Sequence, residues 1–142
     1  MNKEKSCGAV IYRYKDNKIY FLLSKMGFGH ISLSKGHVEK GETELETAKR
    51  EILEETSLEP EFDTNFRYKI TYSPAKNVIK DVIFFVAEQK EDKTPIDLHD
   101  DEVVGFLWLE YESAYKTLSH DSDKEVLENA NKYIKGKENG KF

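Results

Sequence analysis

The sequence has few of the features that mark secreted, membrane or disulfide-stabilised proteins. Cys7 is the only cysteine among 142 residues, which excludes an intramolecular disulfide and a metal cluster built from cysteines. The longest uninterrupted apolar run, Val82 to Ala87, has six residues, whereas a membrane-spanning helix needs roughly 20. The amino terminus also lacks the long apolar core and cleavage site of a signal peptide. We therefore expect a cytoplasmic protein that does not contact a membrane.

Positive charge is scarce relative to negative charge. The chain carries 27 acidic and 22 basic side chains, which gives a formal net charge of −5. This balance provides no general attraction to nucleic acid or to an anionic membrane. We therefore expect no stable nucleic-acid partner, and an anionic substrate would need local positive charge or a bound metal ion. A small molecule is the expected partner, and the expected assembly is a monomer or a weak dimer.

The chain also lacks repeats, low-complexity tracts and linkers rich in proline. We expect a single domain over residues 1–142, with a frayed tail at 136–142. Segment 26–42 has four glycines and few large apolar residues, so we interpret it as a functional loop.

Hydrophobic periodicity and turn residues predict strands interleaved with helices. Thr43 with Glu46 forms a capping box at the start of the first helix, and Ser122 with Glu125 forms a second box before the last. The expected fold class is α/β (α+β), a mixed β-sheet sandwiched between helices. The predicted strands cover 6–14, 19–23, 66–72, 78–88 and 103–109, and the predicted helices cover 43–57, 111–118 and 123–135.

Three glutamates crowd one face of the first predicted helix. Glu51, Glu54 and Glu55 stand at i, i+3 and i+4, which places them within about 100° of arc. Like charges at this spacing repel, so a cation is expected among them unless the face is simply solvated. A cluster of oxygen ligands suits Mg²⁺ or Mn²⁺ better than Zn²⁺. The helix therefore predicts a site for hard divalent ions that could assist a phosphoryl displacement.

A longer pattern places these glutamates in a fixed frame. Gly36, Glu42 and the run Arg50 to Leu58 match G-x5-E-x7-R-E-U-x-E-E-x-G-U, where U is bulky and apolar, except that Ser57 replaces the last glycine. The pattern resembles the signature of Nudix hydrolases. Ser57 can adopt the left-handed cap of that glycine at a cost of roughly 1 kcal/mol. The resemblance implies structural roles for Gly36 and Glu42, and an Arg50–Glu42 pair that orients the cluster.

The resemblance extends beyond this motif. Residues 35–48 and 6–10 are similar to the asymmetric diadenosine tetraphosphate hydrolases within the family. Glu102 stands six residues before Trp108, as an acidic residue stands before a Trp-Leu pair in that subgroup. Two positions before the Lys-Gly-His segment depart from the subgroup, Ile31 where Trp is usual and Ser34 where Pro is usual.

The resemblance also implies the catalytic machinery. Glu51, Glu54 and Glu55 would ligate Mg²⁺, with Mn²⁺ possible. One of these glutamates, or Glu102, would take the proton from water, and which of them is the base stays open. The expected catalytic residues are Glu54, Glu55, Arg50 and Glu102.

Substrate contacts are expected outside the helix. Lys35 and His37 would contact phosphate, because a polyphosphate needs donors that the net charge does not provide. Tyr72 could stack on adenine, although an aromatic residue in an alternating strand is as readily part of a core. The histidines without a partner at metal-ligand spacing are interpreted as structural or exposed; they are His30, His99 and His120.

The leading functional hypothesis is a Mg²⁺-dependent pyrophosphohydrolase that converts diadenosine tetraphosphate to ATP and AMP. Two alternatives within the same class are removal of pyrophosphate from RNA 5′ ends and hydrolysis of damaged nucleoside triphosphates. A third hypothesis, from another class, is a non-catalytic module that binds a nucleotide. Retention of every glutamate of the motif and of Arg50 argues against that last hypothesis.

Overall fold

A computed structural model describes residues 2–98 and 102–140, so His99 lies outside the described residues. In this part of the chain seven strands form one sheet, with the order β3-β2-β1-β6-β5; β4 pairs with β1, and β7 pairs with β2. The sheet is mixed, as predicted, because β1 runs parallel to β6 and antiparallel to β2. The strands are β1 (Asn2–Lys15), β2 (Lys18–Met26), β3 (Ile31–Ser32), β4 (Ser34–His37), β5 (Glu61–Tyr72), β6 (Val78–Glu88) and β7 (Val103–Leu109).

A hairpin with a tight turn joins β1 to β2, the strands predicted at 6–14 and 19–23. Asp16 and Asn17 both have positive φ, 53° and 64°, which is the conformation that a two-residue hairpin turn requires and that Asp and Asn tolerate. Residues 6–12 of β1 are buried throughout. A strand buried on both faces needs a cover on each side of the sheet.

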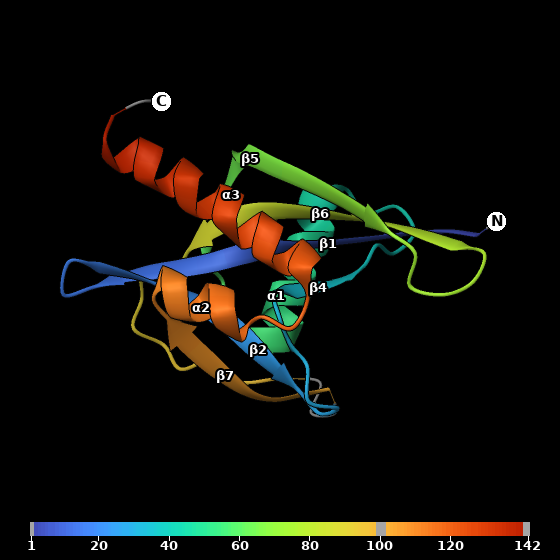
Figure 1. The fold of residues 1–142 in the computed structure, drawn as a ribbon, viewed down its shortest axis with the longest axis horizontal. Helices are drawn as coiled ribbons and strands as arrows, with labels where there is room; N and C mark the ends of the chain where they lie inside the picture. The colour runs from blue at the N-terminus through green and yellow to red at the C-terminus, as the bar shows by residue number, and fades with distance from the viewer. Residues whose placement is uncertain (1, 99–101, 141–142) are drawn as a thin grey trace.

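Three helices provide that cover, on opposite faces of the sheet (Figure 1). On one face α1 (Glu44–Thr56) packs Ala48 and Ile52 against the sheet. On the other, α2 (Tyr111–Thr117) packs over β2 and β7, and α3 (Asp121–Glu138) packs over β5 and β1. The predicted sandwich of a mixed sheet between helices is confirmed. Within the described residues, each helix is too short or too polar to cross a membrane.

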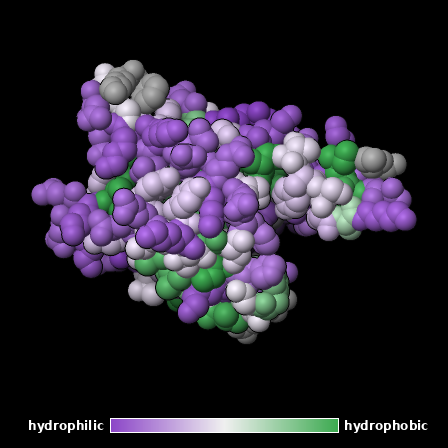
Figure 2. Space-filling model, viewed as in Figure 1, coloured by the Kyte–Doolittle hydropathy of each residue, from purple (hydrophilic) through white to green (hydrophobic). Residues whose placement is uncertain are grey.

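The outer surface follows the same division. Figure 2 shows that the face over α2 and α3 is mainly hydrophilic, while hydrophobic residues gather near β7 at the bottom of the view. Val104 at the start of β7 is 71% exposed.

The predicted loop at 26–42 contains two short strands, β3 and β4. Periodicity cannot detect strands of two and four residues, since so few positions define no pattern. The antiparallel pairing of β4 with β1 sets Lys35 opposite Gly8 and His37 opposite Ser6. This pairing fixes the loop against the centre of the sheet.

The last helix differs from its prediction at both ends. α3 begins at Asp121, after His120, and no side chain caps it, so the predicted Ser122–Glu125 box is wrong. The Glu125 carboxylate instead accepts a hydrogen bond from the Tyr68 hydroxyl at 2.6 Å. At the other end the helix continues to Glu138, into the segment expected to fray.

A contact with β5 accounts for the longer helix. Lys137 Nζ lies 2.7 Å from the Asp63 carboxylate, and the Tyr133 hydroxyl donates to the same group. β5 itself begins at Glu61, five residues before its predicted start, and thereby supplies Asp63.

Candidate active site

The carboxylate helix α1 begins and ends as the sequence predicts. Thr43 Oγ1 accepts a hydrogen bond from the Glu46 N–H, and the Glu46 carboxylate accepts one from the Thr43 N–H, which confirms the capping box. At the other end Ser57 has φ 64° and ψ 4°, and its N–H donates to the Leu53 carbonyl. Ser57 therefore replaces the glycine of the motif without changing the geometry of the cap.

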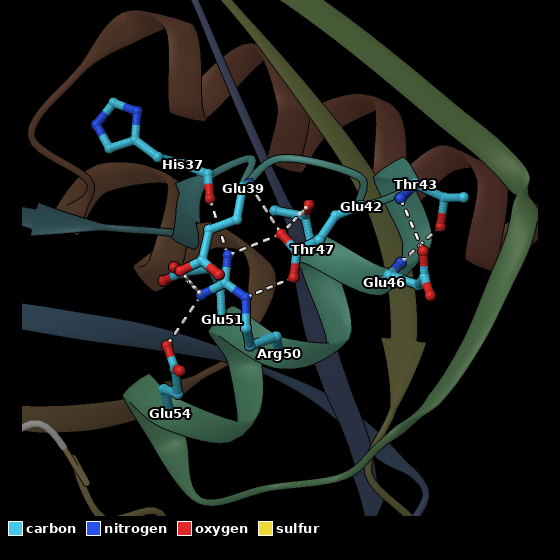
Figure 3. A network of polar contacts seen from close by, with 9 residues as sticks. All are labelled: His37, Glu39, Glu42, Thr43, Glu46, Thr47, Arg50, Glu51 and Glu54. Carbon is cyan, nitrogen blue, oxygen red and sulfur yellow. Dashed lines mark hydrogen bonds and ion pairs between the residues drawn. The ribbon is translucent and has the colours of Figure 1, made fainter.

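Arg50 donates hydrogen bonds to the carboxylates of Glu42, Glu51 and Glu54 and to the His37 carbonyl, and its Nη1 lies 3.6 Å from the Glu39 carboxylate (Figure 3). Its Nε and Nη2 donate to the two oxygens of Glu42, at 2.7 and 3.0 Å, so the predicted pair is present. Its Nη1 donates to Glu51 at 2.7 Å and to Glu54 at 3.1 Å. Hydrogen bonding to Arg50 lowers the pKa of Glu42 to about 2. Glu42 is thus a permanent anion that anchors the guanidinium among the glutamates.

Gly36 lies where a larger residue would displace a glutamate. A Cβ atom at this position would overlap the side chain of Glu51. Gly36 pairs with Cys7 of β1, so the backbone of β4 cannot move away without breaking the sheet. The missing side chain therefore allows α1 and β4 to approach closely.

A cavity of about 430 Å³, the first cavity, lies beside this contact. Glu51, Glu55 and Glu102 contribute carboxylates to its lining, while Lys35 and Lys80 contribute ammonium groups. Burial raises the pKa of Glu55 to about 7, a rise that Lys35 opposes and that Glu51 and Glu102 increase. Side chains of opposite charge thus line one cavity.

Glu55 is the carboxylate most in need of a cation. It is partly buried, and it makes no hydrogen bond or ion pair with any other residue of 2–98 or 102–140. A carboxylate in this situation is costly unless a cation or a proton compensates it. The metal ligands that this carboxylate and its acidic neighbours offer are oxygens, which suit a hard divalent ion. Glu51 and Glu102 lie in the same lining and could contribute further ligands.

The carboxylates do not converge on one point in this structure. Among the described residues no three acidic, histidine or cysteine side chains are arranged to hold a metal ion. Arg50 explains this, because it holds Glu51 and Glu54 through the same nitrogen. Glu51, Glu54 and Glu55 nevertheless lie on adjacent turns of α1, at i, i+3 and i+4, and so share one face of the helix.

Lys80 and Ser6 belong to the first cavity, and the sequence analysis did not identify them. Lys80 lies on β6, opposite Tyr72 of β5 and Glu4 of β1. Burial lowers its pKa, and the nearby Lys35 lowers it further. Ser6 is fully buried, and its Oγ has no hydrogen-bond partner in the described structure. A lysine in a strand that is apolar from Val82 to Ala87 was the signal that could have identified this position.

Tyr72 lines a second cavity, of about 360 Å³, which shares Met26, Ser32 and Lys35 with the first. Aromatic rings form much of its lining. His30 Nδ1 and His120 Nε2 are 3.1 Å apart, and the ring of Phe28 packs edge-on against His30. Lys35 thus lies between a charged cavity and an aromatic one.

The structure distributes the predicted site residues over three places. The motif residues Glu42 and Glu54 surround Arg50, while Tyr72 lies apart in the second cavity. The remaining predicted site residues all line the first cavity; they are Lys35, Gly36, His37, Glu51, Glu55 and Glu102.

This combination of fold and site defines a class of protein. Residues 3–130 match the family described as NUDIX domain, which covers most of the chain. The chain therefore belongs to the NUDIX domain family and is a Nudix hydrolase, as its motif indicates. Nudix hydrolases generally act on small nucleotide substrates and use divalent metal ions.

Individual relatives show a narrower similarity. The chain is 33% identical over 141 residues to the asymmetrical bis(5′-nucleosyl)-tetraphosphatase of Mus musculus, covering 92% of this chain and 95% of the mouse chain. It is 31% identical, with the same coverage, to the enzyme of that name from Rattus norvegicus. Among solved structures it resembles a C. elegans Ap4A hydrolase in a binary complex, with a TM-score of 0.86 and 28% identity over 94% of this chain and 98% of that one.

Proposed function

We propose that this chain hydrolyses dinucleoside tetraphosphates, with diadenosine tetraphosphate converted to ATP and AMP. The observation that carries the proposal is the first cavity, where the carboxylates of Glu51 and Glu55 face the ammonium groups of Lys35 and Lys80. In a polyphosphate chain with bound divalent cations, the cations complement the carboxylates and the phosphate oxygens complement the ammonium groups. The names of the mouse, rat and C. elegans relatives support the same substrate class.

The acidic residues are assigned to the metal and to the proton transfer. Glu51, Glu54 and Glu55 would hold Mg²⁺, or Mn²⁺ in its place, and Arg50 would keep Glu51 and Glu54 oriented. When bound, the metal neutralises phosphate charge and lowers the pKa of water. One of these glutamates, or Glu102 across the cavity, takes the proton of the attacking water.

The basic and aromatic residues are assigned to the substrate. Lys35, Lys80 and His37 line the first cavity and would contact phosphate oxygens. Tyr72 lies in the adjoining second cavity and would stack on one base. A base bound in the second cavity determines which phosphorus lies beside the carboxylates. We therefore expect asymmetric cleavage of the tetraphosphate.

The reaction needs no covalent intermediate. The oxygen of water forms a bond to one phosphorus while the bond from that phosphorus to a bridging oxygen breaks. The proton of water moves to a carboxylate, and the bridging oxygen leaves with the other product. Water oxygen therefore enters only one of the two products.

Product analysis in ¹⁸O-labelled water tests this proposal. The full chain with Mg²⁺ should convert diadenosine tetraphosphate to equal amounts of ATP and AMP, with ¹⁸O in only one of them. Formation of two equivalents of ADP would show symmetric cleavage and would overturn the proposed position of the substrate in the two cavities. No turnover of this substrate, together with rapid release of pyrophosphate from triphosphorylated RNA or from modified nucleoside triphosphates, would overturn the assignment of substrate.

The proposal extends to the setting of the enzyme. We place a single domain, residues 1–142, in the cytoplasm as a monomer or weak dimer.

A further inference from the structure

A buried carboxylate lies in the lining of the second cavity and has no role in the reaction described above. Asp123, in the first turn of α3, is only 3% exposed. Its Oδ2 accepts one long hydrogen bond, 3.4 Å, from the Leu33 N–H. Its Oδ1 has no hydrogen-bond partner among the residues that the structure describes. The carboxylate therefore retains most of its capacity to accept hydrogen bonds.

A buried carboxylate with unused acceptor capacity destabilises the folded state unless hydrogen-bond donors reach it. Burial raises the pKa of Asp123, and the nearby Lys35 and the hydrogen bond from Leu33 oppose that rise. Lys35 forms no ion pair with it within the described structure. The missing donors must come from solvent or from a ligand that enters the second cavity.

The rest of the lining indicates the shape of that ligand. Tyr72, Phe28 and the His30–His120 pair present aromatic surfaces, which suit a flat, apolar ring system. The second cavity adjoins the first, because Met26, Ser32 and Lys35 line both. A purine nucleotide fits this arrangement. Its flat base would lie against the aromatic side chains with its polar edge at Asp123, and its polyphosphate would extend into the first cavity.

We propose that Asp123 selects the nucleobase in the second cavity and favours guanine over adenine, an inference that rests on the proposed function. Guanine presents two adjacent donors, N1–H and the N2 amino group, which match the two oxygens of a carboxylate. Adenine presents one donor, the N6 amino group, beside the acceptor N1, which would face an oxygen lone pair. The preferred substrates are therefore dinucleoside polyphosphates with guanosine at the gripped end.

The decisive variant is Asp123→Asn. It keeps the size of the side chain and an oxygen for the Leu33 N–H, but replaces one acceptor with a donor. Wild type should show a kcat/KM about tenfold higher for diguanosine than for diadenosine tetraphosphate. The variant should lose this preference or reverse it, since an amide matches the edge of adenine. Asp16→Asn is the control, because it removes the same charge from an exposed position in the turn between β1 and β2, outside both cavities, and should keep the wild-type ratio.

Two further measurements keep the inference testable independently of catalysis and of folding. Titration calorimetry of GMP and AMP measures base preference without hydrolysis, so it remains informative if no dinucleoside tetraphosphate is cleaved and the proposed function fails. Diinosine tetraphosphate lacks the N2 amino group, and on wild type it should be used less well than the guanosine compound, even if Asp123→Asn does not fold. Equal use of guanine and adenine by wild type, or a preference that survives Asp123→Asn, would overturn the inference.

Discussion

At the scale of single residues, the surroundings of each glutamate determine what it can do. Glu42 and Glu55 belong to the same motif and have the same chemistry in isolation. Arg50 lowers the pKa of Glu42 to about 2, whereas burial raises that of Glu55 to about 7. Glu42 thus stays charged and structural, and Glu55 gains most from an added cation.

This difference predicts the behaviour of Glu55→Gln. We expect kcat with saturating Mg²⁺ to fall by about 10², or roughly 2.7 kcal/mol in barrier, because a metal-binding charge is lost. Stability without metal should be kept or slightly increased, since an unpaired carboxylate is removed from a partly buried position. Steady-state kinetics and thermal melting measure the two effects.

Glu59→Gln is the control for this change, because Glu59 is exposed just beyond α1 and should tolerate the substitution in both assays. Turnover of Glu55→Gln close to that of wild type would refute its assignment to the metal.

At the scale of elements, α1 is fixed to the rest of the fold at both ends. Near its start, Glu44 accepts two hydrogen bonds from Arg67 of β5 at 2.8 Å and lies 2.7 Å from Lys5 of β1. Near its end, the N–H groups of Ile96 and Leu98 donate to carbonyls of the last turns. These contacts hold the carboxylate face of α1 against β4, where the first cavity forms.

The ion pairs of Glu44 predict a pH-dependent contribution to stability. Hydrogen bonding to Arg67 lowers the pKa of Glu44 from 4.5 to about 2. A lowered pKa stabilises the folded state above the pKa of the unfolded chain, and that stability is lost as pH falls from 4.5 towards 2. Because Arg67 and Lys5 are about half exposed, solvent screens the pairs. We expect Glu44→Gln to lower the free energy of unfolding at pH 7 by about 1 kcal/mol.

Urea denaturation at a series of pH values measures this effect. The difference between wild type and Glu44→Gln should narrow below pH 4.5 and vanish near pH 2. Glu61→Gln removes an ion pair between Glu61, at the start of β5, and Lys90, which follows β6. Both partners are mostly exposed, so its effect should be near zero throughout. A Glu44→Gln difference that is constant with pH would contradict the assignment.

At the scale of the whole molecule, the first cavity is built by elements that are distant in sequence. β1 and β4 supply Ser6 and Lys35, α1 supplies Glu51 and Glu55, and β6 supplies Lys80. A ligand bound there would connect these elements, and a ligand that binds only the folded state stabilises it by mass action.

We therefore expect millimolar Mg²⁺ or Mn²⁺ to raise the melting temperature by about 2–5 °C. Glu51→Gln should reduce this shift, because it removes a carboxylate of the first cavity. Differential scanning fluorimetry at constant ionic strength, with NaCl as the reference, separates ion binding from screening. Identical melting curves in Mg²⁺ and NaCl would argue against a carboxylate site for divalent ions.

The sequence by itself determined the features that depend on neighbouring residues. The capping box at Thr43, the left-handed Ser57 and the carboxylate face of α1 all follow from local backbone and helical geometry, and the structure contains them. The Arg50–Glu42 pair could be predicted for a similar reason, since a recognisable motif fixes its spacing. The mixed sheet between helices followed from the alternation of strand and helix patterns.

Only the tertiary structure decided the features that depend on strand register and on packing between distant segments. Lys80 reaches the first cavity because β6 lies between β1 and β5, a neighbourhood that no local pattern encodes. The predicted cap at Ser122 is absent, and Glu125 instead bonds to Tyr68, 57 residues away in sequence. Asp123 became a candidate for base recognition only when α3 packed beside Leu33 and buried it. A buried charge acquires its role from the groups around it, and those groups are assembled by the fold.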